Sequence, residues 1–294
     1  MKAVDFDYVR AASLEEACRL LAEAGEEAKL IAGGQSLVPL LAMRLARPSL
    51  LIDINRLSEL EGISLEDGQL RLGALTRQAT ALADIRVQGE APLLAKALAL
   101  VGHGQTRNRG TLGGSLAHAD PAAEIGLATL ALDGEIIARS AAGERRIPAR
   151  HFFTGPMTTT LASDECLTEV RFARRPRAGR CGAGFREMSM RHGDFALVAV
   201  AVELMLDGEG VCRRAALSVG GVGGAPVRLE AAAAPLLGTR LGEGDLAAAA
   251  ELVRESLAPQ SDQHASADYR RRLAFVLARE ALAEARDEAL RAGA

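Results

Sequence analysis

The chain has 294 residues, of which 49% are hydrophobic, so it can bury the cores of roughly two to three compact domains and is not a disordered chain. Its 35 basic residues nearly balance 38 acidic ones, and the net charge of −3 gives no electrostatic reason to expect nucleic acid or an anionic membrane as a partner. No apolar run approaches the ~20 residues that span a bilayer, and residues 1–7 lack a signal-peptide core, so we expect a cytoplasmic protein without a membrane span.

The beginning of the sequence predicts alternating helices and strands. Ser13 followed by Glu16 is a capping box, which indicates a helix that ends near Gly25. A buried strand at 28–32, a helix at 37–45 and a second strand at 50–54 follow. This alternation is typical of α/β packing, in which helices cover a sheet.

The middle of the chain predicts a strand at 70–75, a helix at 92–101, a hairpin formed by 135–139 and 145–148, and a strand at 165–172. Four arginines, a proline and a glycine then interrupt the periodicity between residues 174 and 180. We therefore expect a first domain at 1–173, with subdomains at about 1–56 and 57–173, and a second domain at 174–294.

The second domain begins with two predicted antiparallel strands, 195–206 and 211–219, joined by a turn at 207–210. Three helical stretches follow, and the longest runs from about 266 to 290. Its Leu273, Val276, Leu277 and Ala281 are expected on one apolar face. The predicted fold class is α+β, with an antiparallel sheet and helices in the second domain.

The segment Ala32-Gly33-Gly34-Gln35-Ser36 lies between a predicted strand and a predicted helix. Backbone N–H groups without partners collect at such a junction, and the helix dipole there favours an anion. Two glycines let the main chain approach a phosphate closely, and Ser36 adds a hydroxyl donor. The alternative is a plain tight turn that requires positive φ.

A second segment, Thr111-Leu112-Gly113-Gly114-Ser115, repeats this chemistry, with hydroxyl residues on both sides of a glycine pair. Two such turns could clasp one diphosphate from opposite sides. The sequence contains neither a GxGxxG motif nor a P-loop. A third glycine cluster, at 220–224, lacks hydroxyl residues and is expected to be a structural loop between a strand and a helix.

The four cysteines are far apart and lack the spacing of metal ligands, so we interpret Cys18, Cys166, Cys181 and Cys212 as core thiols and expect no metal site. Any iron–sulfur cluster would belong to a partner. With 3% aromatic residues, the chain offers few rings to stack on a cofactor, which would be held mainly by backbone and polar groups.

Three segments together carry a family resemblance: residues 32–37, the eighteen residues 107–124, and Arg191-His192-Gly193-Asp194-Phe195-Ala196. They closely resemble the medium, FAD-binding subunit of the xanthine dehydrogenase and carbon monoxide dehydrogenase family of molybdenum hydroxylases, over essentially the whole chain. The resemblance implies an FAD-binding fold of the vanillyl-alcohol-oxidase (PCMH) type with a small and a larger subdomain, followed by a C-terminal domain of the carbon monoxide dehydrogenase flavoprotein type.

The resemblance also implies the cofactor contacts. They fall on Leu30, Ile31, Ala32, Gly33, Gly34, Gln35, Ser36, Leu37, Val101, Thr111, Leu112, Gly113, Gly114, Ser115, Glu124, Leu167 and Arg186. Glu124 has a plainer alternative as an ordinary acidic residue at a helix N-terminus. Arg186 departs from the family, since some relatives carry a lysine there, but its charge would still stabilise reduced flavin. His118 is interpreted as a polar lining or packing residue and His192 as structural, with Asp194 fixing a turn, so no catalytic residue is expected.

The function implied is electron transfer. Electrons from [2Fe-2S] clusters on a small subunit would pass through FAD to an external acceptor, while a large subunit with a molybdenum–molybdopterin cofactor oxidises the substrate, in a dimer of heterotrimers. The alternatives are a stand-alone FAD-dependent oxidoreductase of the same fold and a non-redox nucleotide-binding module. The substrate and the acceptor stay open.

Overall fold

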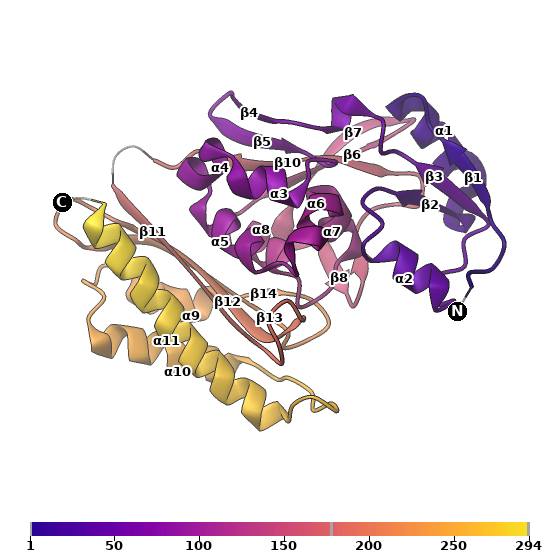
Figure 1. The fold of residues 1–294 in the computed structure, drawn as a ribbon. Coiled ribbons are helices and arrows are strands. Elements are labelled where there is room, and N and C mark those ends of the chain that lie inside the picture. Colours follow the sequence, from indigo (N-terminus) through magenta and orange to yellow (C-terminus); the bar gives the residue numbers. More distant parts are fainter. Residues whose placement is uncertain (1, 177–178, 293–294) are drawn as a thin grey trace.

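The computed structural model describes residues 2–176 and 179–292. Its N-terminal unit is a small parallel sheet with helices. The strand order is β1 (Asp7–Arg10), β3 (Leu50–Asp53), β2 (Ala28–Ile31). Helix α1 (Leu14–Ala24), the 3-10 turn η1 (Gly25–Glu27) and α2 (Leu37–Ala42) complete it (Figure 1). The predicted alternation is confirmed, whereas β1, a short edge strand with mostly exposed residues, was not predicted.

The start of α1 follows the predicted cap with one difference. The Ser13 hydroxyl accepts a hydrogen bond from the Glu16 N–H at 3.2 Å, as a capping residue should. The Glu16 carboxylate, however, accepts from the N–H of Ala12 at 2.7 Å instead of from that of Ser13. The helix begins where the sequence predicted, and its cap extends one residue further back.

The central unit is built on a five-stranded antiparallel sheet. Its order is β4 (Ile63–Glu66), β5 (Gln69–Gly73), β10 (Cys166–Ala173), β6 (Glu135–Ser140), β7 (Gly143–Pro148). One side is covered by α3 (Gln78–Ala83), α4 (Ile85–Glu90), α5 (Pro92–Leu100), α6 (Gly104–Arg109), α7 (Leu112–His118) and α8 (Glu124–Ala131) (Figure 1). Smaller elements are η2 (Ser58–Leu60), η3 (Ala149–His151), β8 (Phe153–Gly155) and β9 (Thr158–Thr159). The predicted hairpin, strands and α5 are confirmed.

The C-terminal unit is a four-stranded antiparallel sheet covered by helices. The strands run in the order β11 (Arg180–Ser189), β12 (Ala196–Leu206), β13 (Cys212–Gly220), β14 (Val227–Arg228). The helices are α9 (Glu230–Ala233), α10 (Glu243–Ser256) and α11 (Ala267–Arg291), with η4 (Ala234–Leu236) after α9. The glycine cluster 220–224 connects β13 to β14, and α9 follows only after β14. The cluster is therefore a loop between two strands, and the prediction of a loop between a strand and a helix was wrong.

Helix α11 crosses β11 at very close range. A Cβ at Gly182 would lie 1.8 Å from the carbonyl oxygen of Ala285, and one at Gly184 would lie 2.0 Å from that of Ala281. Only glycine lets the helix backbone rest on this strand. On α11 itself, Leu273, Leu277 and Ala281 are buried as predicted, but Val276 is 46% exposed, so its assignment to the apolar face was wrong.

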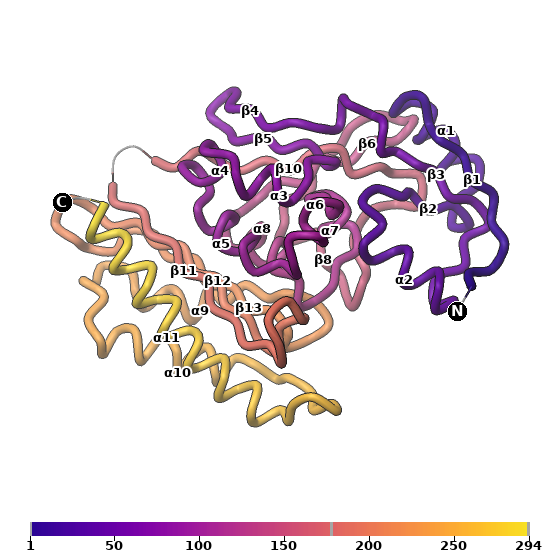
Figure 2. Tube along the Cα trace, viewed as in Figure 1, coloured from indigo at the N-terminus to yellow at the C-terminus, as the bar shows by residue number. Residues whose placement is uncertain are grey.

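The units stack in layers, with the helices of the central unit between its own sheet and the C-terminal sheet (Figures 1 and 2). One hydrophobic cluster contains Leu94 and Ala97 of α5 together with Ala183 and Phe185 of β11. The two units therefore share a core, and the joint between them is closely packed. Within the described part of the chain, no helix is both long and apolar enough to cross a membrane.

Candidate functional site

The first glycine segment forms the loop from β2 to α2, as predicted. Gly34 has φ +71°, and the Gln35 side chain donates to the carbonyl oxygen of Gly33 at 3.3 Å. Among the described residues, none accepts a hydrogen bond from the backbone N–H groups of residues 33–37, and the Ser36 hydroxyl is also without a partner. This loop can therefore donate several hydrogen bonds to an anion.

The second glycine segment is not a turn, and that prediction was wrong. Thr111 is the N-cap of α7, and its hydroxyl accepts from the N–H of Gly114 at 3.1 Å. The N–H groups of Leu112 and Gly113 donate to the carbonyl oxygens of Thr76 (3.1 Å) and Ala74 (2.8 Å). These backbone donors are already used within the protein, whereas Gly114 is exposed and the Ser115 hydroxyl has no partner among the described residues.

The two segments lie against each other. A Cβ at Gly33 would be 2.2 Å from the carbonyl oxygen of Arg109, which precedes α7, so this position tolerates only glycine. A Cβ at Gly114 would be 4.0 Å from the Cβ of Ala32. The structure thus brings together the segments 32–37 and 111–115, while the flanking Leu30 and Ile31 are half-buried on β2.

Arg77 brings a positive charge close to these segments, because its guanidinium donates to the carbonyl oxygen of Arg109, which meets Gly33. Arg77, Arg107 and Arg109 form no ion pair within the described ranges. The guanidinium of Arg107 donates to the carbonyl oxygen of Val101 at 2.8 Å, which attaches the end of α5 to α6. The Arg77 guanidinium, which has no carboxylate partner among the described residues, makes the surroundings favourable for an anion.

Glu124 is the first residue of α8 and is 6% exposed. Burial, together with the negative charge of Asp120, raises the pKa of its carboxyl to about 7. Sequence reasoning missed a second such group, Glu187 on β11. Burial and the charge of Glu124 raise the pKa of Glu187 to about 7, and its Oε2 is buried without a hydrogen bond in the described structure. The two carboxyls thus interact across the joint between the central and C-terminal units.

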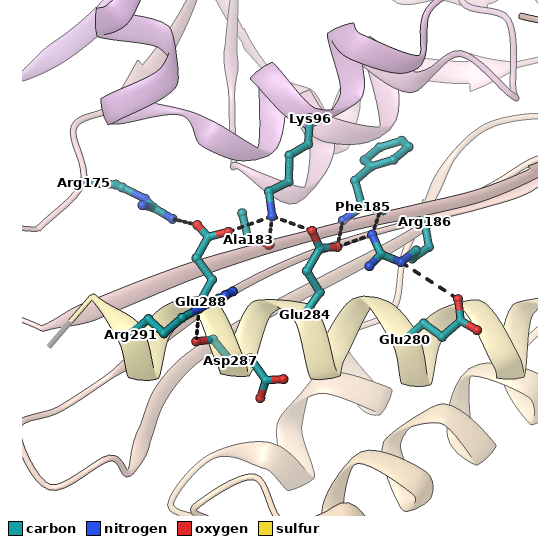
Figure 3. A network of polar contacts seen from close by, with 10 residues as sticks. All are labelled: Lys96, Arg175, Ala183, Phe185, Arg186, Glu280, Glu284, Asp287, Glu288 and Arg291. Atoms are coloured by element: carbon teal, nitrogen blue, oxygen red, sulfur yellow. Dashed lines mark hydrogen bonds and ion pairs between the residues drawn. The ribbon is translucent and has the colours of Figure 1, made fainter. Parts of the chain in front are cut away.

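The structure does not bring Arg186 to this cluster. Its guanidinium donates to Glu284 at 2.5 Å and lies 3.9 Å from Glu280, both on α11 (Figure 3). Successive side chains of a strand point to opposite faces, so Arg186 faces α11 while Glu187 faces Glu124. The alternation along β11 is the signal that could have found Glu187.

Leu167 lies on β10 and is 5% exposed. The carbonyl oxygen of the next residue, Thr168, accepts from the N–H of Ala74 at 2.8 Å, and the carbonyl oxygen of Ala74 accepts from Gly113. Leu167 is therefore connected through the backbone to the start of α7. Its side chain belongs to the core of the central unit.

The two histidines singled out in the sequence lie at different places in the fold. The rings of His192 and His103 pack with centroids 5.7 Å apart, which is a contact between the C-terminal and central units. Asp194 accepts from the Arg191 guanidinium at 2.9 Å and fixes the turn after β11, as predicted. His118 is half-buried at the end of α7.

The cysteines are free and buried, which confirms their prediction as core thiols. Burial raises the pKa of Cys166 to about 12, so this thiol stays protonated and unreactive. Over the residues described, no group of three or more His, Cys, Asp or Glu side chains could hold a metal ion.

Comparison with known proteins identifies the class. Residues 4–174 match the model of the FAD binding domain in molybdopterin dehydrogenase, and residues 183–285 match that of the CO dehydrogenase flavoprotein C-terminal domain. The chain is 43% identical over 285 residues to the 6-hydroxypseudooxynicotine dehydrogenase complex subunit alpha of Paenarthrobacter nicotinovorans, covering 97% of this chain and 96% of that subunit.

Solved structures agree with this match. A chain of quinoline 2-oxidoreductase from Pseudomonas putida 86 superposes with a TM-score of 0.93 at 39% identity, covering 99% of this chain and 100% of its own length. A chain of carbon monoxide dehydrogenase from Hydrogenophaga pseudoflava gives 0.94 at 33% identity, covering 98% and 99%.

The chain belongs to the family of FAD-binding subunits of molybdenum-containing dehydrogenases. It is the flavoprotein component of a multi-subunit oxidoreductase, and FAD is its cofactor. The predicted family, the α+β fold and the cofactor are confirmed.

Proposed function

We propose that the diphosphate of FAD binds between the loop 33–37 and the exposed side of α7. The observation that carries this proposal is the set of N–H groups at residues 33–37 without acceptors in the described structure. The hydroxyls of Ser36 and Ser115 and the guanidinium of Arg77 would supplement these donors. Leu30, Ile31, Ala32, Gln35 and Leu37 would form the walls on the N-terminal side and Val101 and Gly114 those on the other, with the buried Thr111, Leu112 and Gly113 fixing Gly114 from behind.

Glu124 is proposed to contact the cofactor beyond the second segment. Because its pKa is raised to about 7, its carboxyl holds a proton over part of the neutral range and can donate a hydrogen bond. Leu167 is proposed to support this region through β10. We do not include Arg186 among the direct contacts, because its guanidinium is bound to Glu284.

The chain's role is to relay electrons within a larger assembly. FAD suits this task because it exchanges both single electrons and pairs, while the protein supplies binding and tuning. We propose a small subunit with [2Fe-2S] clusters as the donor and a large molybdopterin subunit as the site of substrate oxidation, arranged as a dimer of heterotrimers. The designation of two relatives as medium chains of carbon monoxide dehydrogenase supports a larger and a smaller partner subunit.

We also propose that the chain divides near residue 173 into an FAD-binding domain, with subdomains at about 1–56 and 57–173, and a C-terminal domain at 174–294. The two family matches, which end at residue 174 and start at residue 183, support this division. The shared core of α5 and β11 implies that the two domains do not move freely.

Purification of the full chain tests cofactor binding. We expect a yellow protein with flavin absorption or, after removal of the flavin, uptake of added FAD at about one equivalent per chain. A chain that carries no flavin and takes none up would refute the proposal.

Coexpression with the proposed small and large subunits tests the electron-transfer role. Copurification with iron and molybdopterin supports this role, whereas substrate oxidation by the chain alone supports a stand-alone enzyme.

A further inference from the structure

Two side chains from outside the glycine segments connect them. The guanidinium of Arg77, which immediately precedes α3, donates to the carbonyl oxygen of Arg109 at 2.6 Å and to Oδ1 of Asn55 at 2.9 Å. The Asn55 amide in turn donates to the carbonyl oxygens of Ala32 at 2.7 Å and Ile31 at 3.3 Å. A continuous path of hydrogen bonds thus runs from the first glycine loop to the residues just before α7.

Both ends of this path are fixed. Oδ1 of Asp53, at the end of β3, accepts from the backbone N–H of Asn55 at 2.9 Å and from its side chain at 2.8 Å. At the other end, Arg77 pairs with Thr111 in an isolated antiparallel bridge. The two glycine segments are in close contact, since a Cβ at Gly33 would overlap the Arg109 carbonyl oxygen. A small shift of either end of the hydrogen-bonded path therefore changes the distance between the two segments.

We propose that Arg77, oriented by Asn55, is a positioning residue that sets the separation of the first glycine loop and α7, and thereby the affinity for a diphosphate ligand. This inference rests on the proposed function, since it takes the diphosphate of FAD as that ligand. Arg77 has no carboxylate partner among the described residues, so its charge also stays available to an anion nearby. A lysine would keep the charge but lacks the planar fork that spans two acceptors.

The test measures FAD binding to the full chain after removal of flavin, by calorimetric titration, with ADP as a second probe that carries the diphosphate without the flavin ring. The variants are Arg77→Lys, Asn55→Ala and their combination, and the control is Arg56→Ala, an exposed neighbour. We expect each single variant to weaken FAD and ADP binding by the same factor, about tenfold or more. The control should stay within about twofold of the parent.

The combined variant distinguishes one shared path from two separate effects. If Asn55 acts through Arg77, the double variant should bind FAD no more weakly than the weaker single variant. The melting temperature of each flavin-free variant shows whether it is folded. If Arg77→Lys is not folded, the FAD and ADP titrations of Asn55→Ala test the inference.

Binding of FAD by both single variants within about twofold of the parent would overturn the inference. So would additive losses in the double variant, or a loss seen with FAD but not with ADP. Each of these results leaves the proposed function intact, because the parent still binds FAD. A parent chain that takes up no FAD instead refutes the proposed function, and the inference with it.

Discussion

The ammonium nitrogen of Lys96, on α5, lies 2.7 Å from Oε1 of Glu284, on α11 (Figure 3). The same nitrogen is 2.7 Å from Oε2 of Glu288 and donates to the carbonyl oxygen of Ala183 at 2.7 Å. Glu284 also accepts from the N–H of Phe185. One lysine of the central unit therefore bridges two carboxylates of the C-terminal unit at the edge of their shared core.

Replacing Lys96 with methionine should lower the free energy of unfolding by about 1–3 kcal/mol, because two partly buried carboxylates each lose one of their two cationic partners and are left with Arg186 and Arg175. Urea denaturation followed by circular dichroism measures this change. The control is Lys29→Met, at an exposed lysine of β2, which should alter stability by less than about 0.5 kcal/mol. Equal effects of the two substitutions would mean that the Lys96 contacts contribute no net stability.

Gly33→Ala should weaken FAD binding at least about tenfold and lower the free energy of unfolding by about 1–3 kcal/mol. The added methyl group would overlap the Arg109 carbonyl oxygen and push the loop away from α7. Gly89→Ala in α4, where a Cβ meets nothing within 4 Å, is the control and should be neutral or slightly stabilising. Titration with FAD and thermal melting give both quantities. Parent-like FAD affinity in Gly33→Ala would contradict the close approach of the two segments.

Substitutions of Thr111 and Ser115 should have different effects, the first on stability and the second on FAD binding. Thr111→Val removes the acceptor for the Gly114 N–H and should cost about 1 kcal/mol of stability, while Thr111→Ser should restore most of it. Ser115→Ala should leave the melting temperature of the flavin-free chain unchanged and weaken FAD binding severalfold, because this hydroxyl has no partner among the described residues. Thermal melting with and without FAD measures both effects. A Ser115→Ala chain with parent affinity for FAD would remove this hydroxyl from the proposed site.

The raised pKa of Glu187 predicts a dependence of stability on pH. Its folded-state pKa of about 7 lies above the ordinary 4.5, so the protonated form is favoured in the folded chain. The corresponding stability is complete below the ordinary pKa and is lost as the pH rises through about 7. Glu187→Gln should therefore stabilise the flavin-free chain by about 1–2 kcal/mol near pH 8 and by less than about 0.5 kcal/mol near pH 5.

Urea denaturation at the two pH values checks this prediction. Glu26→Gln, at an exposed glutamate, should show no difference between them. A Glu187→Gln stabilisation of the same size at both pH values would mean that ionisation of Glu187 is not its cause.

The helices and strands that have clear signals in neighbouring residues, such as hydrophobic periodicity, a helix cap or a turn, were predicted from the sequence. Helix α1 begins at its Ser13 cap, and the hairpin of β6 and β7 forms around Gly143 as expected. Strand β11 was missed, because Gly182 and Gly184 lower its strand propensity, and the reason for them is a helix about 100 residues later. The strand propensity of neighbouring residues carries no information about this contact between β11 and α11.

The candidate site shows the same limit. The first glycine loop was predicted correctly, since a strand, two glycines and a helix follow one another in the chain. The start of α7 was predicted as a turn, because a glycine pair disfavours a helix unless tertiary contacts, here Thr76 and Ala74, use its first N–H groups. Asn55 lies in the turn after β3 and Arg77 directly before α3, and nothing in their neighbouring residues indicates that they meet.

The Lys96 contacts also bear on how the chain is made. Glu284 and Glu288 follow Lys96 by 188 and 192 positions. At a synthesis rate of ~5–20 residues per second, roughly 10–40 seconds separate the appearance of the lysine from that of its partners. During this interval the Lys96 ammonium group has neither of its two carboxylate partners. The joint between the two units is therefore completed late in translation, after the loop 33–37 has already been synthesised.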